Sequence, residues 1–185
     1  GFPQLVFHSL LLAALTSILA LGLALLLAYG RRLRGTTAVR AAVGTAGLGY
    51  AIPGTVIAVG VILPFAWLDN TIDAWARAHL GVSTGLILSG TLVALVFAYL
   101  VRFLAVSLQT VESGLAKIAI SLDETARSLG ANPTRTLRTV HMPIMRGSLL
   151  TAVLLVFVDV MKELPATLIL RPFDFNTLAV RAFEL

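Results

Sequence analysis

The sequence predicts an all-α membrane protein, a polytopic bundle of transmembrane helices. Hydrophobic residues make up 58% of the 185 residues and charged residues only 12%, about half the share of an ordinary soluble domain. Mean hydropathy is +0.94. Charged side chains are absent from 1–30, 41–68 and 78–101, and each stretch exceeds the ~20 apolar residues of a membrane-spanning helix. Helices are expected because an isolated strand would leave backbone groups unpaired in lipid.

Four spans are expected within one membrane domain. The first is rich in Leu and Ala and is followed by Gly30 and two arginines. The second contains Pro53-Gly54 and Pro64, where the Pro-Gly pair predicts either a hinge or a packing kink. The third closes near an arginine, and the fourth alone carries internal charges. The expected spans are about 5–29, 46–68, 85–105 and 148–170.

Lysine and arginine predict the orientation, because loops rich in them stay in the cytoplasm. Of the 14 lysine and arginine residues, three lie on the side that is expected to be outside: Arg77, Arg171 and Arg181. Residues 30–45 and 106–147 are therefore expected to face the cytoplasm, residue 1 to lie outside, and 69–84 to form an outer loop. Ten lie on the cytoplasmic side: Arg31, Arg32, Arg34, Arg40, Arg102, Lys117, Arg127, Arg135, Arg138 and Arg146. Of these, Arg102 is expected to extend from its span to the interface.

Residues 121–143, SLDETARSLGANPTRTLRTVHMP, form a polar and bent segment of an otherwise apolar chain, here called the polar hairpin. Ser121 and Glu124 have the spacing of a capping box, in which Ser121 is the N-cap and Glu124 reaches back to it. Gly130 is expected to end this first helix with a positive φ.

A second short helix is expected in the polar hairpin. Asn132 is its predicted N-cap, with Pro133 at the first helical position. The helix is expected to run to about His141, with Pro143 marking its end. Three interpretations remain open: an amphipathic loop at the membrane surface, a DNA-binding helix-turn-helix, or a docking element for a cytoplasmic partner. The position between two spans disfavours nucleic acid.

The polar hairpin resembles the signature E-A-A-x3-G-x9-I-x-L-P of the permeases of bacterial binding-protein-dependent ABC importers. All the spacings match. Thr125, Val140 and Met142 are conservative departures from Ala, Ile and Leu. The residues at the signature positions are Glu124, Thr125, Ala126, Gly130, Val140, Met142 and Pro143.

The resemblance implies a type I ABC importer permease (MetI-like) core in a bacterial inner membrane, with loop 106–147 coupling it to an ATPase. Such a core has five spans, so at least one helix is expected beyond 185. The implied partners are a cytoplasmic ATPase dimer, a periplasmic solute-binding protein, a second permease half or subunit, and the lipid bilayer.

Within the implied coupling helix, Ala126 would permit close approach and Gly130 the bend. Glu124 would either cap its own helix or offer its charge to a basic residue of the ATPase. Arg127 would pair with acidic groups of that partner or remain solvated.

No catalytic, cofactor or metal site is predicted in this chain. The sequence contains no G-x-x-x-x-G-K-[ST] segment, so ATP is expected on a separate subunit. Cysteine is absent, which leaves no residue for thiol catalysis or Cys-ligated zinc. No cluster of His or Tyr has the spacing of iron ligands.

The fourth span carries Asp159, Lys162 and Glu163, which would share one helical face. At 1.5 Å per residue from 148, Asp159 would lie about 17 Å into the bilayer. Charges at such depth normally face protein or water. They are expected either to hold this helix to its neighbours or to line a translocation path, and Pro165 is expected to kink the helix beside them.

The segment K-E-L-P-A-T-L-x-L-R-P followed by F-x-T-L-A resembles the ferric-iron branch of these permeases, near thiamine and polyamine importers. One signature implies one half of a two-repeat polypeptide. The expected function is passage of a solute, ferric iron in this branch, from a binding protein into the cytoplasm. Two rivals remain: an ion-coupled transporter that uses Asp159, Lys162 and Glu163, and a membrane scaffold without transport.

Overall fold

The computed structural model describes residues 2–173 and 175–184, and every regular element in them is helical. This confirms the predicted all-α class; the prediction for residue 1 lies outside the described residues. By length and composition, a fourth membrane span is possible only if two helical segments joined at a bend, 133–144 and 146–162, are counted together as one span. The helices long and apolar enough to cross a membrane are α1 (Phe2–Leu33), α3 (Gly54–Leu80) and α4 (Leu92–Ala116).

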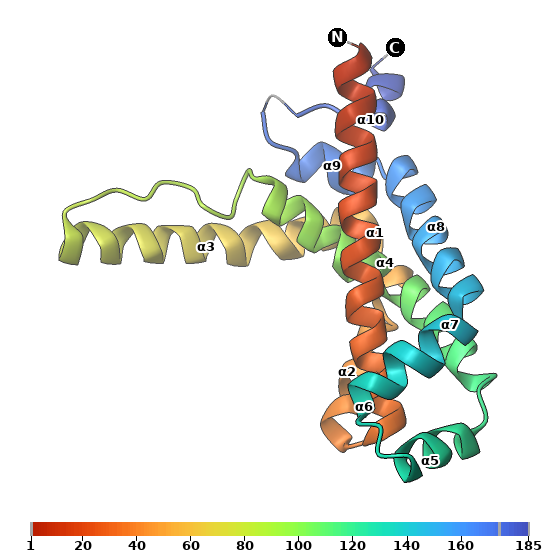
Figure 1. The fold of residues 1–185 in the computed structure, drawn as a ribbon. Helices are drawn as coiled ribbons and strands as arrows, with labels where there is room; N and C mark the ends of the chain where they lie inside the picture. The colour runs from red at the N-terminus through yellow and green to blue at the C-terminus, as the bar shows by residue number, and fades with distance from the viewer. Residues whose placement is uncertain (1, 174, 185) are drawn as a thin grey trace.

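Figure 1 shows α1, α4 and α8 side by side as the body of the molecule, with short helices at both ends. The two termini lie close together at one end, and the polar hairpin lies at the other. The remaining elements are α2 (Thr37–Ala46), a 3-10 turn η1 (Gly49–Ala51), α5 (Ile120–Ser128), α6 (Pro133–Thr136), a π-helical turn η2 (Leu137–His141), α7 (Met142–Ile144), α8 (Arg146–Lys162), α9 (Pro165–Leu170) and α10 (Leu178–Phe183).

Small residues let the three long helices of the body approach closely. Ala13 and Ala20 of α1, Ala94 of α4 and Ala152 of α8 are all fully buried. Without a hydrophobic driving force between helices in lipid, such close packing supplies much of the association energy. The turn η1 also touches α4: a Cβ added to Gly49 would lie 1.8 Å from a backbone oxygen of α4, so only glycine fits there.

The second and third spans differ from their predicted bounds. The helix of the second span begins at Gly54, after η1, and continues through Pro64 without a break. The expected outer loop 69–84 is therefore largely helical, since α3 ends only at Leu80, and Gly81, which caps it, has a φ of +65°. The third helix starts at Leu92 rather than near 85, because 81–91 runs back along α3 (Figure 1).

Two carboxylates on α3 hold this returning segment. Asp69, 1% exposed, accepts the backbone N–H groups of Ile87, Leu88 and Ser89 at 3.1, 2.9 and 2.7 Å. One turn later, Asp73 accepts backbone N–H groups from the same segment. The distal part of α3 and 81–91 thus form one projecting unit, here called the α3 arm (residues 65–91), as Figure 1 shows.

Replacement of Asp69 with alanine is expected to release 81–91 from α3 without unfolding the body. Three backbone donors would lose their shared acceptor, and each unpaired donor costs about 1–3 kcal/mol if it stays buried. Amide hydrogen exchange at 87–89 should accelerate by about tenfold or more. Asn70→Ala, at an exposed neighbouring position, is the matched control. Unchanged exchange in Asp69→Ala would contradict this account.

Candidate functional site

The polar hairpin (121–143) consists of α5 and a second helical segment formed by α6, η2 and α7. Gly130 has a φ of +79°, which confirms the predicted left-handed turn. Asn132 caps α6 as predicted: its side-chain oxygen accepts the N–H of Arg135 at 2.8 Å, and Pro133 is the first helical residue. A glycine in this conformation, followed directly by a capped helix start, defines the angle between the two helices.

The predicted capping box at Ser121 is wrong. α5 begins at Ile120 with Ala119 as its N-cap, which makes no side-chain hydrogen bond. Ser121 and Glu124 therefore lie inside the helix. The earlier start follows from Ile118, which is buried in the bundle core and determines where the chain turns after α4. Glu124 is exposed, and its carboxylate has no partner in the part of the chain that the structure describes.

The second helical segment continues through Pro143, where an end was predicted. In the π-helical turn η2, the N–H of Met142 donates to the carbonyl of Leu137. This wider turn accommodates Pro143, which lacks an N–H and whose ring would clash with the carbonyl four residues earlier in an α-helix. The segment ends at Met145 instead, and there the chain bends by 80° into α8.

The signature residues divide between the interior of the hairpin and an exposed surface. Ala126 is 9% exposed and therefore contributes little to the outer surface. Val140 and Met142 are half-buried. The exposed signature residues, with the neighbouring arginine, are Glu124, Thr125, Arg127, Gly130 and Pro143. Much of this outer surface belongs to α5 and is free to contact another protein.

Arg32, at the end of α1, joins the polar hairpin to the body. Its Nε donates to Oδ2 of Asp123 at 2.7 Å, and its terminal nitrogens donate to the carbonyls of Leu115 and Ile118 at 2.6 and 2.9 Å. The other oxygen, Oδ1, lies 2.5 Å from Nε2 of His141. Burial alone would raise the pKa of Asp123, but the hydrogen bonds from Arg32 and His141 outweigh it and hold that pKa below its ordinary value. The carboxylate is therefore ionised at neutral pH.

Sequence reasoning missed this contact. Asp123 is 91 positions from Arg32 and 18 from His141, so no helical spacing connects the three. His141 occupies a variable position of the signature, which assigns it no role. The one signal in the sequence is the polar side chain of His141 among the apolar residues of V-H-M-P, since a histidine there would need a hydrogen-bond partner if it were buried.

A second charged contact lies within the membrane helices, between Arg102 of α4 and Glu163. Nε of Arg102 lies 3.2 Å from Oε2 of Glu163, which is 7% exposed. A terminal nitrogen of Arg102 donates to the carbonyl of Ile52 at 2.7 Å, and Oε1 of Glu163 accepts the N–H of Ala166 at 3.3 Å. A Cβ on Gly54 would lie 2.3 Å from that same Oε1. Glycine at the start of α3 therefore leaves room for the carboxylate.

The predicted cluster of Asp159, Lys162 and Glu163 is not assembled. α8 ends at Lys162, and Glu163 follows with an extended ψ of 112°. Asp159 is half-buried and Lys162 exposed, and no ion pair joins these three side chains. The predicted kink at Pro165 is a complete break, after which Pro165 begins α9; a proline there removes an N–H and its ring opposes the carbonyl four residues back.

Arg102 also differs from its prediction. It points to Glu163 inside the bundle rather than extending to the membrane interface. The reason is the break after α8, which turns the Glu163 carboxylate towards α4. Within the described ranges, no group of three or more His, Asp or Glu side chains is placed to hold a metal ion.

Comparisons with known proteins place this architecture among membrane transport components. Residues 20–178 match the family model described as binding-protein-dependent transport system inner membrane component. The Fe(3+)-transport system permease protein FbpB 2 of Haemophilus influenzae is 28% identical over 135 residues, which cover 73% of this chain and 24% of that protein.

Two further relatives are also transport permeases that match this chain over only part of their own length. A 2-aminoethylphosphonate transport system permease protein, PhnV, of Salmonella typhimurium is 35% identical over 98 residues, covering 53% of this chain and 37% of that protein. The ferric transport system permease protein FbpB 1 of Haemophilus influenzae is 27% identical over 125 residues, covering 68% and 17%. The chain thus spans well under half the length of the curated relatives it matches.

Proposed function

Because the chain belongs to the family of binding-protein-dependent transport system inner membrane components, we propose that it forms part of the permease of an ATP-driven ABC importer. One observation carries this proposal above all. The signature at 124–143 lies on a rigidly bent hairpin at the end of the bundle, with the exposed face of α5 free for a partner (Figure 1). ATP hydrolysis then belongs to a separate subunit, and this chain transmits its motion.

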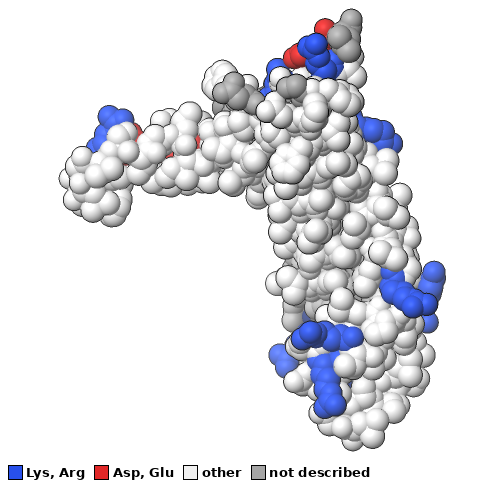
Figure 2. Space-filling view, turned by 45° about the horizontal axis from the view of Figure 1, so that its top comes forward, with Lys and Arg blue, Asp and Glu red and all other residues white. Residues whose placement is uncertain are grey.

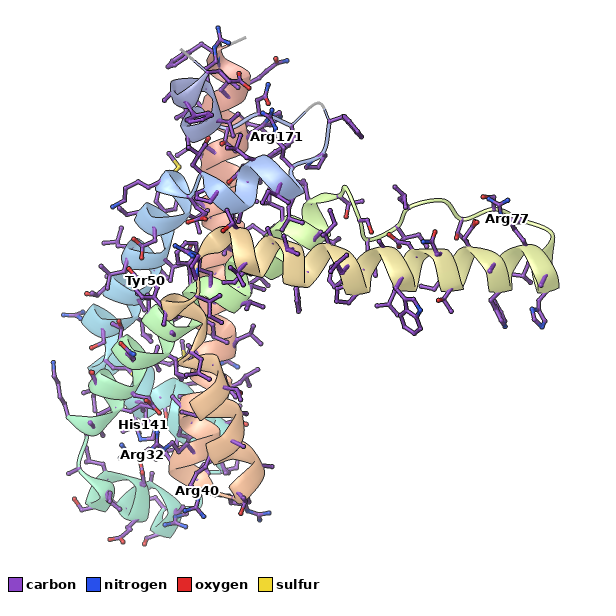
Figure 3. All side chains as sticks on the ribbon, turned by 180° about the vertical axis from the view of Figure 1, so that it is seen from behind. Arg32, Arg40, Tyr50, Arg77, His141 and Arg171 are labelled. Atoms are coloured by element: carbon purple, nitrogen blue, oxygen red, sulfur yellow. The ribbon has the colours of Figure 1, made fainter. Side chains whose placement is uncertain are left out.

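The distribution of basic residues supports a cytoplasmic position for the polar hairpin. Figure 3 places Arg32, Arg40 and His141 at one end of the bundle, with Arg171 at the other end and Arg77 on the α3 arm. Figure 2 shows Lys and Arg side chains gathered over the hairpin end. Two loops far apart in the sequence thus combine into one basic end, the arrangement that retains loops in the cytoplasm. This orientation presents α5 to a cytoplasmic ATPase.

The connections of the hairpin suggest how motion would reach the membrane. α5 follows α4 after a turn of three residues, 117–119, and the second helical segment joins α8 at the bend of 80°. When two ATPase subunits close on ATP, each hairpin would move with its subunit. α4 and α8 would then tilt and open the translocation path towards a periplasmic solute-binding protein. After ATP hydrolysis the two helices would return and close that path.

For the solute we propose ferric iron, which the names of two of the three relatives above give; the 2-aminoethylphosphonate permease has the higher identity, 35% against 28% and 27%, over a shorter alignment. The Fe(3+)-transport permease aligns with 73% of this chain, against 53% for the 2-aminoethylphosphonate permease. Glu163 is paired with Arg102 and is not joined by an ion pair to Asp159 or Lys162, which supports a structural role for this carboxylate; the uptake experiment below separates the ion-coupled alternative from the proposal. A second permease half or subunit would complete the path.

The proposal is tested with the full-length protein in proteoliposomes containing its ATPase, supplied with the solute-loaded binding protein outside and ATP inside. Uptake should require ATP and should persist when a protonophore removes the proton gradient. Uptake without ATP that follows an ion gradient would overturn the proposal in favour of a secondary transporter.

A further inference from the structure

The polar hairpin is connected covalently to α4 and α8 but touches α1 through a small number of polar side chains. A cavity of about 400 Å³ lies between the end of α1 and the hairpin, lined by Tyr29, Arg32, Ile118, Asp123, Arg127 and Pro133 among others. Continuous apolar packing therefore does not hold the hairpin to α1 on this side. A force that passes directly from the hairpin to α1, and not through the packing of α1 against α4 and α8, must pass through the hydrogen bonds that border the cavity.

Arg32 is the centre of these bonds. Its planar guanidinium binds Asp123 at the start of α5 and, with its other nitrogens, the carbonyls that end α4. Such a fork fixes direction as well as distance, which an ammonium group does not. The Arg32 and Asp123 side chains are only 14% and 16% exposed, so water competes little with the pair. One α1 residue thereby holds the turn between α4 and α5.

His141 connects the other half of the hairpin to the same carboxylate. It is fully buried, with Nε2 2.5 Å from Oδ1 of Asp123 and the ring edge-on to Tyr29 at 5.3 Å. The Tyr29 hydroxyl donates to the carbonyl of Pro133 at 2.8 Å. Nδ1 has no partner among the described residues. Because the ionised Asp123 carboxylate can only accept, Nε2 is the donor of the hydrogen bond between them.

We propose that Arg32, Asp123 and His141 act as a latch that makes α1 follow the polar hairpin during transport. The inference rests on the proposed function, in which an ATPase moves the hairpin. α4 and α8 follow through the backbone, whereas α1, which packs against both, is in addition held to the hairpin directly by the latch. The three side chains are positioning residues, because they lie behind the exposed docking face formed by Glu124, Thr125 and Arg127 and are not themselves offered to the ATPase.

The test uses the full-length protein with its ATPase and binding protein, and measures ATPase co-purification, ATP hydrolysis and solute transported per ATP. His141→Leu removes the donor to Asp123 while leaving the docking face unchanged. ATPase binding should be retained, and solute per ATP should fall about tenfold, within the usual range of couplings between sites. His141→Gln, whose amide can donate to Asp123, should restore most of the loss.

Arg32→Lys is a milder second variant, since it keeps the charge but cannot reach all three acceptors at once. It should lower solute per ATP by less than His141→Leu. Arg31→Lys is the matched control, because Arg31 is 52% exposed and, among the residues that the structure describes, pairs only with Glu112 at the surface; it should behave as wild type.

The outcomes separate two failures. If wild-type protein neither binds an ATPase nor needs ATP, the proposed function fails. If wild type is ATP-driven but His141→Leu and Arg32→Lys transport normally per ATP, or lose ATPase binding in parallel with uptake, the three residues are not a latch. Failure of His141→Gln to recover would also overturn the inference.

Discussion

Replacement of Glu124 with arginine is expected to abolish uptake and to release the ATPase from the permease. Glu124 is exposed on α5, and its carboxylate has no partner in the described part of the chain. The substitution therefore removes nothing that the fold uses. In the proposed docking, however, the reversed charge would meet the basic ATPase residue that Glu124 is expected to contact. Like charges at an interface cost several kcal/mol, and a central contact alone contributes about 2 kcal/mol or more.

The measurement is co-purification of the ATPase with the full-length protein, together with ATP-dependent uptake. Glu124→Gln, which removes the charge without reversing it, should show an intermediate loss. Glu112→Arg is the matched control: it makes the same charge change on α4, where Glu112 pairs with Arg31 at 3.0 Å on an exposed surface. Such surface pairs contribute about 0–1 kcal/mol, so uptake should be retained. Normal uptake by Glu124→Arg would refute α5 as the docking helix.

Removal of either Arg102 or Glu163 alone is expected to destabilise the protein. Arg102→Met leaves the Glu163 carboxylate, 7% exposed, without its partner, and an uncompensated buried charge costs about 3–5 kcal/mol. Glu163→Gln leaves Arg102, which is 22% exposed, so its cost should be smaller. Arg102→Met would strand the carboxylate between α3 and α9. Glu163→Gln would remove the negative charge that faces the guanidinium and leave it only neutral acceptors, the carbonyl of Ile52 and the new amide oxygen. Thermal unfolding of the purified full-length protein in detergent should show both losses as decreases in Tm, with the larger decrease for Arg102→Met.

The double variant Arg102→Met/Glu163→Gln separates a charge requirement from a packing requirement. It should be more stable than either single variant, because no uncompensated charge remains. Lys162→Met is the control, since Lys162 is exposed and unpaired within the described residues and should change Tm little. If the double variant is as unstable as the sum of the singles, the two side chains do not act as a pair. If the double variant is stable, its rate of solute uptake shows whether the Arg102–Glu163 pair is also needed for transport.

Local sequence signals determined a large part of this molecule. The uncharged runs predicted a membrane bundle, because covering so many apolar residues requires lipid. Gly130, Asn132 and Pro133 predicted the bend of the polar hairpin, since each acts on its own backbone. The signature at 124–143 depends only on spacing along the chain, and the family match over 20–178 agrees with it.

Local signals failed at two helix boundaries. Ser121 has the spacing of a cap, yet burial of Ile118 starts α5 earlier. Asp159, Lys162 and Glu163 have helical spacing, yet Pro165 ends the helix between them and redirects Glu163. In the first case a contact from another element set the helix boundary. In the second case the boundary lies beside Pro165, a local signal that predicted a kink where the helix in fact ends at Lys162.

The sequence by itself thus determined the helical membrane class, the bend of the hairpin and its exposed signature, because hydrophobicity and backbone preference are properties of neighbouring residues. Only the tertiary structure decided which charges meet. Arg32 with Asp123 and Arg102 with Glu163 are pairs from distant helices. The physical reason is that a buried charge is stabilised by whatever opposite charge the packing of the helices brings within a few ångströms, and spacing along the chain carries no record of that packing.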